Sequence, residues 1–332
     1  MRNLIASVVT GVVALVAGDR VLGWYGQRHF LPERQMQTAV AAGDGCIMFL
    51  GDSRIEAALN HAVVHQALSQ RGADRCIADL GMGAMDVSGE FLAARRYLAS
   101  GRNPILAVVG KVEDSLMDPD ATGPAKMVGN NAIHLVWTNS RDVFAEVDGF
   151  PFASVAAFDD GLRFLIARGT AFGRYQSLVS LRVQRLQDGL TGTDRGLENR
   201  FGQLSDMAAL ERDLREHADA RLAAATDKPG VRSSWFDRLV DMLHSRGTRV
   251  AVVEIPMPSA YRQSISASVQ AGAYRRWFTD HLRTRGVVYI DLALAPWVDD
   301  DSSMFVDPLH LSPAGAAHFS RDLGDRLPTV VP

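Results

Sequence analysis

The stretch from Ile47 to Arg54 reads Ile-Met-Phe-Leu-Gly-Asp-Ser-Arg, and the rest of the fold can be worked out from it. Its four apolar residues are typical of a buried strand that ends at Gly51. The pattern from Arg54 to Gln70 is that of a helix, so Ser53 should lie on a strand-to-helix turn. A serine there can present its hydroxyl above the sheet edge, close to the N–H groups of the helix N-terminus. The alternative is that Asp52 or Ser53 merely caps the helix.

A second polar motif lies near the end of the chain. Residues 305–315 read Phe-Val-Asp-Pro-Leu-His-Leu-Ser-Pro-Ala-Gly and include Asp307 and His310, just before another predicted helix. A serine hydroxyl is a weak nucleophile at neutral pH, and it needs a base whose imidazole is held in one tautomer. A spacing of three residues on a turn with proline can bring Asp307 and His310 together. The same spacing in Asp241-x-x-His244 falls within a predicted amphipathic helix, where both side chains should be solvated.

Gly51-Asp52-Ser53 and Asp307-x-x-His310 resemble the first and last sequence blocks of the SGNH (GDSL-like) hydrolase and acyltransferase family. The resemblance covers roughly residues 44–327, with a long divergent middle. It implies a Ser-His-Asp triad in which Ser53 is the nucleophile, His310 is the general base and Asp307 orients the imidazole. Such a triad works without a cofactor, and none is predicted.

The resemblance also implies an oxyanion hole. A second strand should end at Gly81, whose backbone N–H would bind the oxyanion beside that of Ser53. Alternatively, Gly81 and Gly83 simply form a turn. After its third strand the family usually has Gly-x-Asn-Asp, whereas this chain reads Gly-Lys-Val-Glu-Asp from Gly110, so the asparagine donor is absent. Lys111 could supply positive charge there, or it could be solvated at the surface.

The two cysteines occupy matching positions before the first two strands. Cys46 lies five residues before Gly51, and Cys76 lies five before Gly81. If the strands are parallel neighbours, the cysteines should be level at the opposite edge of the sheet, about 4.8 Å apart. A disulfide can span that separation, so Cys46 and Cys76 are predicted to form one. Two buried free thiols are the alternative.

The remaining pattern alternates strands with helices. Further strands are predicted at 105–109, 248–255 and 287–292, and helices at 87–100, 233–244, 267–284 and 312–327. Five strands alternating with helices predict an α/β fold: a flavodoxin-like three-layer sandwich around a parallel sheet. Residues from about 115 to 230 do not fit this pattern and are interpreted as a helical insertion between strands 3 and 4. Such an insertion could shape a substrate pocket or dock a partner.

The chain begins with a segment of a different kind. Residues 4–17 are apolar, a run short for a membrane span of about 20 residues but typical of a signal-sequence core. Residues 1–25 are therefore interpreted as a signal anchor or signal peptide, with Asp19-Arg20 near a membrane boundary. Residues 26–44 are interpreted as a linker to an α/β domain at 45–330. Either interpretation places that domain outside the cytoplasm, and the anchor would tether it to the inner membrane on the periplasmic side.

Composition and motif content exclude two classes of function. The net charge is −3 and no basic stripe is interleaved with aromatics, which argues against nucleic acid binding. His61-x-x-x-His65 would place two imidazoles on one helix face, but the glutamate of a zinc-protease motif and a third ligand are missing. No metal site is therefore predicted.

These patterns predict acyl transfer through an acyl-enzyme on Ser53, completed by water in an esterase or by a sugar hydroxyl in a transferase. With its N-terminal segment and insertion, the chain resembles the extracytoplasmic SGNH-like proteins that acetylate envelope or secreted polysaccharides together with a membrane-bound acyltransferase. One alternative is a non-catalytic carbohydrate-binding or assembly subunit, which the missing asparagine favours. Another is a secreted carboxylesterase whose insertion forms an apolar lid.

Overall fold

The fold is taken from a computed structural model of the chain. It describes residues 2–29, 31–83, 85–111, 170–171, 231–259, 262–263, 269–299, 301–307 and 309–331. The chain divides into two compact units, one of Met1–Gln37 with Pro124–Leu197 and one of Thr38–Gly123 with Glu198–Pro332. Ser53 and His310 both belong to the second unit. Most of the predicted insertion lies outside the described residues.

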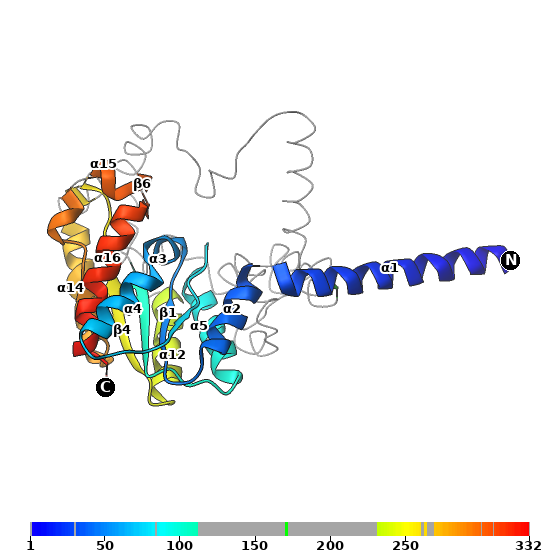
Figure 1. The fold of residues 1–332 in the computed structure, drawn as a ribbon, viewed down its shortest axis with the longest axis horizontal. Coiled ribbons are helices and arrows are strands. Elements are labelled where there is room, and N and C mark those ends of the chain that lie inside the picture. Colours follow the sequence, from blue (N-terminus) through cyan, green and yellow to red (C-terminus); the bar gives the residue numbers. More distant parts are fainter. Residues whose placement is uncertain are drawn as a thin grey trace. The chain divides into compact units, whose positions relative to one another are not determined.

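The second unit is built on a five-stranded parallel sheet with the order β2-β1-β3-β4-β5 (Figure 1). The strands are β1 (Ile47–Leu50), β2 (Ile77–Asp79), β3 (Leu106–Lys111), β4 (Arg249–Glu254) and β5 (Val288–Asp291). All of β1 and β3 is buried, because each has a neighbour on both sides and helices on both faces. This architecture confirms the predicted three-layer α/β fold, and the strand order is the flavodoxin-like one.

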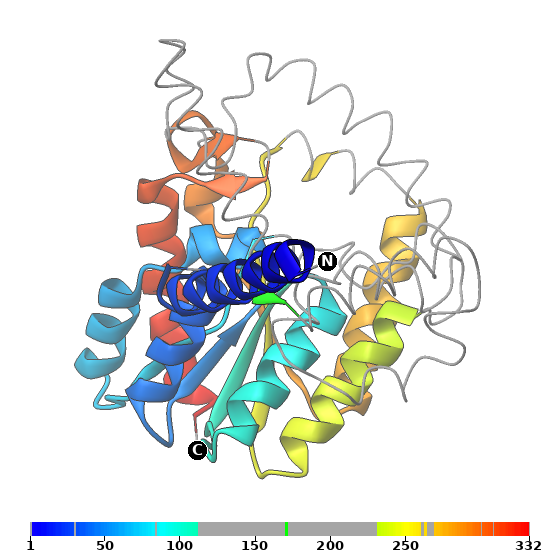
Figure 2. The ribbon, with the colours of Figure 1, turned by 90° about the vertical axis from the view of Figure 1, so that its right-hand side faces the viewer.

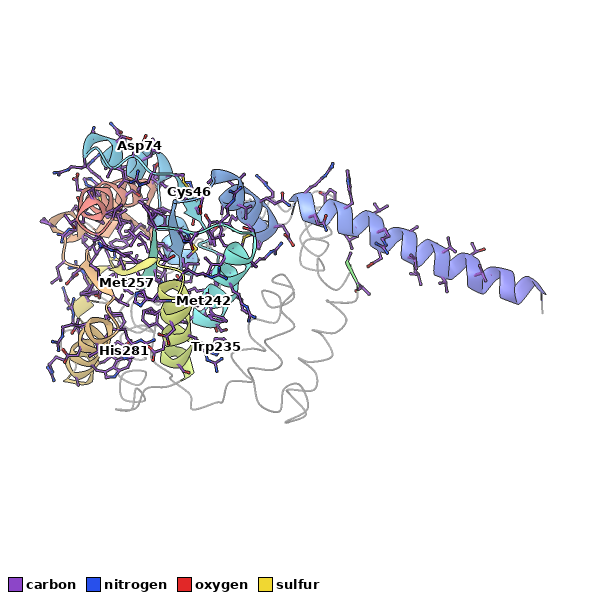
Figure 3. All side chains as sticks on the ribbon, turned by 90° about the horizontal axis from the view of Figure 1, so that it is seen from below. Cys46, Asp74, Trp235, Met242, Met257 and His281 are labelled. Carbon is purple, nitrogen blue, oxygen red and sulfur yellow. A yellow bond between two sulfur atoms is a disulfide. The ribbon has the colours of Figure 1, made fainter. Side chains whose placement is uncertain are left out.

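Helices cover both faces of the sheet (Figure 2). On one face, α4 (His61–Gln70) packs against α16 (Pro313–Arg326), and on the other α5 (Val87–Ala99) packs against α12 (Val231–His244). The helix α14 (Val269–Thr284) joins α12, since His281 Nε2 lies 2.8 Å from Asp237 Oδ1. Figure 3 shows Asp74, which follows α4, on one side of the sheet and Trp235 and His281 on the other. The predicted helices therefore lie close to their expected positions.

One predicted helix is divided in two. The pattern from Arg54 to Gln70 gives α3 (Ser53–Ala58) and then α4, with Asn60 capping α4 by accepting the N–H of Val63. The hydroxyl of Ser320 on α16 accepts the N–H of Asn60 at 2.7 Å and donates to the carbonyl of Ala58 at 3.1 Å. This buried serine satisfies backbone groups that the break leaves without helical partners.

The disulfide predicted between Cys46 and Cys76 is present at the end of the sheet opposite Ser53. Parallel pairing of β1 with β2 opposes Ile47 to Ile77, so the preceding residues are level and their Cα atoms are 4.5 Å apart. The bond joins residues 30 positions apart. For a loop of that size, the loss of chain entropy in the unfolded state contributes about 3–4 kcal/mol of stability.

The N-terminal segment is helical beyond the point where a linker was predicted. The helix α1 spans Arg2–His29 and α2 spans Leu31–Ala42, so most of residues 26–44 is helix. Pro32 does not prevent this, because the first turn of a helix tolerates proline. Seven large apolar side chains of α1 are more than half exposed: Val9, Val12, Val13, Leu15, Val16, Val21 and Trp24. Of the helices that the structure describes, none combines the length and apolar character that a membrane span requires.

Candidate active site

Ser53 lies where the chain leaves the sheet and enters α3. Gly51 has φ +150°, a backbone conformation that favours glycine. The next residue, Asp52, caps α3 by accepting the N–H of Arg54 at 2.9 Å. Because Asp52 is the cap, the hydroxyl of Ser53 can take another partner. Of the two alternatives for this turn, the structure therefore assigns capping to Asp52 and not to Ser53.

Three glycines make room for the helix that carries Ser53. A Cβ built on Gly51 would lie 2.5 Å from Ile55, and one built on Gly81 or Gly110 would lie 2.8 Å from it, closer than real Cβ atoms approach. Gly51 and Gly81 follow β1 and β2, Gly110 is the last residue but one of β3, and Ile55 is completely buried between them. This close packing holds α3 against the edge of the sheet and so fixes the position of Ser53, two residues before Ile55 in the chain.

The structure brings the predicted nucleophile and base together. His310 Nε2 lies 2.9 Å from Ser53 Oγ. The histidine is in β7 (His310–Leu311), a short strand that pairs antiparallel with β6 (Phe305–Asp307) and is separate from the main sheet. Only 8% of His310 is exposed. This is the hydrogen-bond distance at which an imidazole can accept a serine proton.

Asp307 lies opposite His310 in the β6–β7 hairpin. The turn with proline that was predicted here thus connects two short strands, and their pairing brings the two backbones side by side. The side chain of Asp307 lies outside the described part of the structure. Its role in orienting the imidazole stays a prediction.

The hairpin is joined to the start of α16 through Ser312. The N–H of Ser312 donates to the carbonyl of Met304 at 2.8 Å, and its hydroxyl caps α16 by accepting the N–H of Gly315 at 3.1 Å. A Cβ on Gly315 would lie 2.2 Å from that same Met304 carbonyl oxygen. The segment after His310 is therefore closely packed against α15 (Asp301–Met304).

The predicted oxyanion donor Gly81 is engaged elsewhere. Its N–H donates to Asp79 Oδ1 at 2.9 Å, and Asp79 Oδ2 lies 2.8 Å from His61 Nε2. Gly83, in contrast, is exposed, and a Cβ built on it would lie 3.9 Å from that of Ser53. Gly83 therefore adjoins the nucleophile. The sequence analysis named Gly81 alone as the donor and considered Gly83 only as part of a turn.

Charged groups surround the nucleophile turn. Asp52 binds the guanidinium of Arg54, whose Nε lies 3.0 Å from Oδ2. Burial by itself would raise the pKa of Asp52, but the charge and hydrogen bonds of Arg54, with a smaller effect of Lys111, lower it. Lys111 is neither solvated nor placed as an oxyanion donor: it is buried and its Nζ binds Oε1 of Glu90 on α5.

The two histidines considered for a metal site have acidic partners. His61 pairs with Asp79, and His65 Nε2 lies 3.1 Å from Asp74 Oδ1. The hydrogen bond that His61 donates to Asp79 raises the pKa of His61, although burial acts in the opposite direction. Within the described residues, no three His, Cys, Asp or Glu side chains are grouped in a way that could hold a metal ion.

The geometry thus brings together a serine, a histidine that can act as its base, and the backbone of a third predicted triad residue. Comparison of the sequence with protein-family models and with curated proteins gives no match for this chain.

Proposed function

We propose that this protein transfers an acyl group through an acyl-enzyme on Ser53, as an SGNH-like O-acyltransferase or esterase. The observation that carries the proposal is the 2.9 Å hydrogen bond between His310 Nε2 and Ser53 Oγ, which joins residues 257 positions apart. The close packing of Ile55 against three glycines also supports the proposal, because a reaction of this kind needs a nucleophile held in one position.

The reaction would proceed in two halves. Ser53 Oγ attacks the ester carbonyl while His310 accepts its proton, and the protonated imidazole then gives that proton to the leaving alcohol. The N–H groups of Ser53 and Gly83 would stabilise the negative oxygen of the tetrahedral intermediate. His310 next takes a proton from water or a sugar hydroxyl, whose oxygen attacks the acyl-enzyme and restores Ser53. Asp307 would hold the imidazole in the required tautomer.

For the substrate we propose an acetyl ester and, as acceptor, a hydroxyl of an envelope or secreted polysaccharide. This choice follows the resemblance of the sequence blocks and of the N-terminal segment to the SGNH-like proteins that acetylate polysaccharides. A membrane-bound acyltransferase would be the source of the acetyl group. The disulfide supports a location outside the cytoplasm, because structural disulfides persist mainly in oxidising compartments.

A second candidate is a non-catalytic carbohydrate-binding or assembly subunit with the same fold. Two observations favour it: the Gly81 N–H is engaged by Asp79, and the third strand ends in Lys111 without the family's asparagine close behind. Each of these differences removes a donor that the resemblance to the family implies for the oxyanion hole. A protein of this kind would bind oligosaccharides without forming a covalent intermediate.

Intact-mass measurement after treatment with para-nitrophenyl acetate distinguishes the two candidates. We expect one acetyl group on the full-length protein and none on Ser53→Ala, while Ser69→Ala, a variant of an exposed serine on α4, should be acetylated like the wild type. Adding oligosaccharides would then separate transfer from hydrolysis. Folded protein that never carries the adduct would contradict the catalytic proposal, and calorimetric binding of the same oligosaccharides would support the second candidate.

A further inference from the structure

The segment that follows β2 is hydrogen-bonded to the strand and turn that lead to the nucleophile. The N–H of Leu80 donates to the carbonyl of Phe49 at 2.9 Å, and that of Met82 donates to the carbonyl of Gly51 at 3.0 Å. These two bonds continue the parallel pairing of β1 with β2 beyond the strand ends. They hold the segment beside the turn on which Ser53 lies.

The two glycines of this segment differ in what their N–H groups bind. The N–H of Gly81 donates to Asp79 Oδ1 at 2.9 Å, which closes a turn of the kind that aspartate side chains form with the backbone two residues on. The N–H of Gly83 donates to no group among the described residues, and Gly83 is exposed beside Ser53. The amide that adjoins the nucleophile is therefore available to a ligand.

The carboxylate of Asp79 is bound at both of its oxygens. Oδ1 accepts the N–H of Gly81, and Oδ2 lies 2.8 Å from Nε2 of His61, the first residue of α4. The side chain of Asp79 is only 16% exposed. Hydrogen bonds to a carboxylate are among the stronger ones in proteins, so Asp79 cannot turn away from Gly81 without a cost. Through Asp79, the start of α4 holds the turn after β2.

The direction of the Gly83 N–H depends on this turn. Glycine has no side chain to limit its backbone, so Gly83 does not fix its own conformation. The residues before it are fixed instead: Gly81 by Asp79 and by close packing against Ile55, and Met82 by its bond to the Gly51 carbonyl. Loss of the Asp79 side chain would remove one of these restraints directly before Met82 and Gly83.

We propose that Asp79 is a positioning residue for acyl transfer, whose hydrogen bond to the Gly81 N–H holds the turn after β2 so that the Gly83 N–H meets the oxyanion formed at Ser53. The inference rests on the proposed function, because it concerns the same reaction. It gives the bond that engages Gly81 a role in catalysis, although Asp79 touches neither the substrate nor the reacting atoms.

Four variants of the full-length protein test this role. Asp79→Ala removes the acceptor, whereas Asp79→Asn keeps an oxygen for the Gly81 N–H. His61→Ala removes an exposed side chain and leaves the second oxygen of Asp79 without this donor. The matched control is Asp74→Ala: Asp74 also pairs with a histidine of α4, His65, but it lies before β2, at the end of the strand away from the turn.

The rate of Ser53 acetylation by para-nitrophenyl acetate, expressed per folded molecule, is compared first. We expect Asp79→Ala to react roughly ten- to a hundredfold more slowly than the wild type, because an oxyanion donor is misplaced. Asp79→Asn should recover most of the rate, His61→Ala should lose less than Asp79→Ala, and Asp74→Ala should match the wild type. If Asp79→Ala does not fold, His61→Ala decides, and a wild-type rate in that variant overturns the inference.

Rescue by Asp79→Asn separates positioning by the hydrogen bond from a need for the charge. An Asp79→Asn variant as slow as Asp79→Ala would contradict the inference, because the acceptor is still present. An Asp79→Ala variant that reacts at the wild-type rate overturns this inference alone. A wild type that never forms the acetyl adduct overturns the proposed function and the inference with it.

Hydrogen exchange followed by NMR gives a readout that does not depend on activity. In Asp79→Ala, the N–H groups of Gly81 and Met82 should exchange faster than in the wild type, while those in the middle of β1 and β3 keep their protection. Faster exchange throughout the sheet would show that Asp79 stabilises the whole domain and would overturn a local positioning role. Unchanged exchange at Gly81 and Met82 would overturn it as well.

Discussion

The turn that carries Ser53 and the hairpin that carries His310 meet in one hydrogen bond, but they are held in different ways. Ser53 follows a strand with neighbours on both sides, and the packing of Ile55 on three glycines fixes its helix. His310 lies in a two-stranded hairpin outside the main sheet. Hydrogen bonds of Ser312 and the close approach of Gly315 to the Met304 carbonyl, both at the start of α16, connect this hairpin to its surroundings.

This difference suggests that the two halves of the site should fail in different ways. Tight packing leaves no space for even one added methyl group, so small changes at the nucleophile turn should destabilise the whole domain. Single hydrogen bonds contribute little each, so truncating a side chain near the base should spare the fold more often than adding a methyl group at the nucleophile turn. Four predictions test this contrast.

The largest expected effect is on activity, from His310→Ala. Removing the base should slow acetylation of Ser53 by about a hundred- to ten-thousandfold, and urea unfolding should show little change in stability. His318→Ala, on α16 where the ring stacks on Trp297, should keep the wild-type rate. Equal rates for wild type and His310→Ala would mean that the hydrogen bond to Ser53 has no catalytic role.

On the other side of the comparison, Gly110→Ala should reduce the free energy of unfolding by about 2–4 kcal/mol, because the new Cβ would collide with Ile55. The matched control is Gly101→Ala. Gly101 has φ +82° but no atom within 4 Å of an added Cβ, so only backbone strain of about 1 kcal/mol should result. Urea unfolding measures both. Similar losses of stability in the two variants would show that Ile55 can move aside and that it is not tightly packed against the glycines.

Ser320→Ala tests the connection between α16 and the α3–α4 break. The variant loses the hydrogen bonds to the N–H of Asn60 and the carbonyl of Ala58, and we expect a loss of about 1–3 kcal/mol of stability. Hydrogen exchange at the Asn60 N–H should accelerate as well. In Ser245→Ala, an exposed serine that bonds to the Met242 carbonyl, little should change. If the Asn60 N–H keeps its protection from hydrogen exchange in Ser320→Ala, the hydrogen bonds of Ser320 do not stabilise the break between α3 and α4.

The smallest effect concerns the pH dependence of stability. The hydrogen bond to Asp79 raises the pKa of His61, so this pair stabilises the fold fully below about pH 6.5 and less as the pH rises through the raised value. His61 is half exposed, and the change should therefore be small. Unfolding of wild type and His61→Gln at several pH values measures it. An identical slope in both proteins would show that the pair contributes nothing.

The sequence was informative where the cause of a structure is local. The apolar run before Gly51 predicts β1, and the equal spacing of Cys46 from Gly51 and of Cys76 from Gly81 predicts the disulfide, because parallel strands keep the same rise per residue. The pairing of Ser53 with His310 could be proposed because both residues lie in recognisable motifs at turns.

The sequence was less informative where the partner is distant in the chain. The break before α4 depends on Ser320, which lies 260 positions from Asn60, and no periodic pattern reveals it. The partner of Lys111 is likewise set by packing of α5 on the sheet. For Gly81, the pattern indicated a glycine at the right edge of the sheet but could not indicate that Asp79 takes its N–H.

The disulfide has a further consequence for the integrity of the chain. The bond between Cys46 and Cys76 closes a covalent ring that contains Ser53, α3 and α4. A protease that cuts once inside this ring therefore leaves both new ends attached to the same molecule. Such nicked protein would migrate as a single chain on a denaturing gel until a reductant is added, and the nucleophile would stay tethered to the sheet through whichever cysteine remains on its side of the cut.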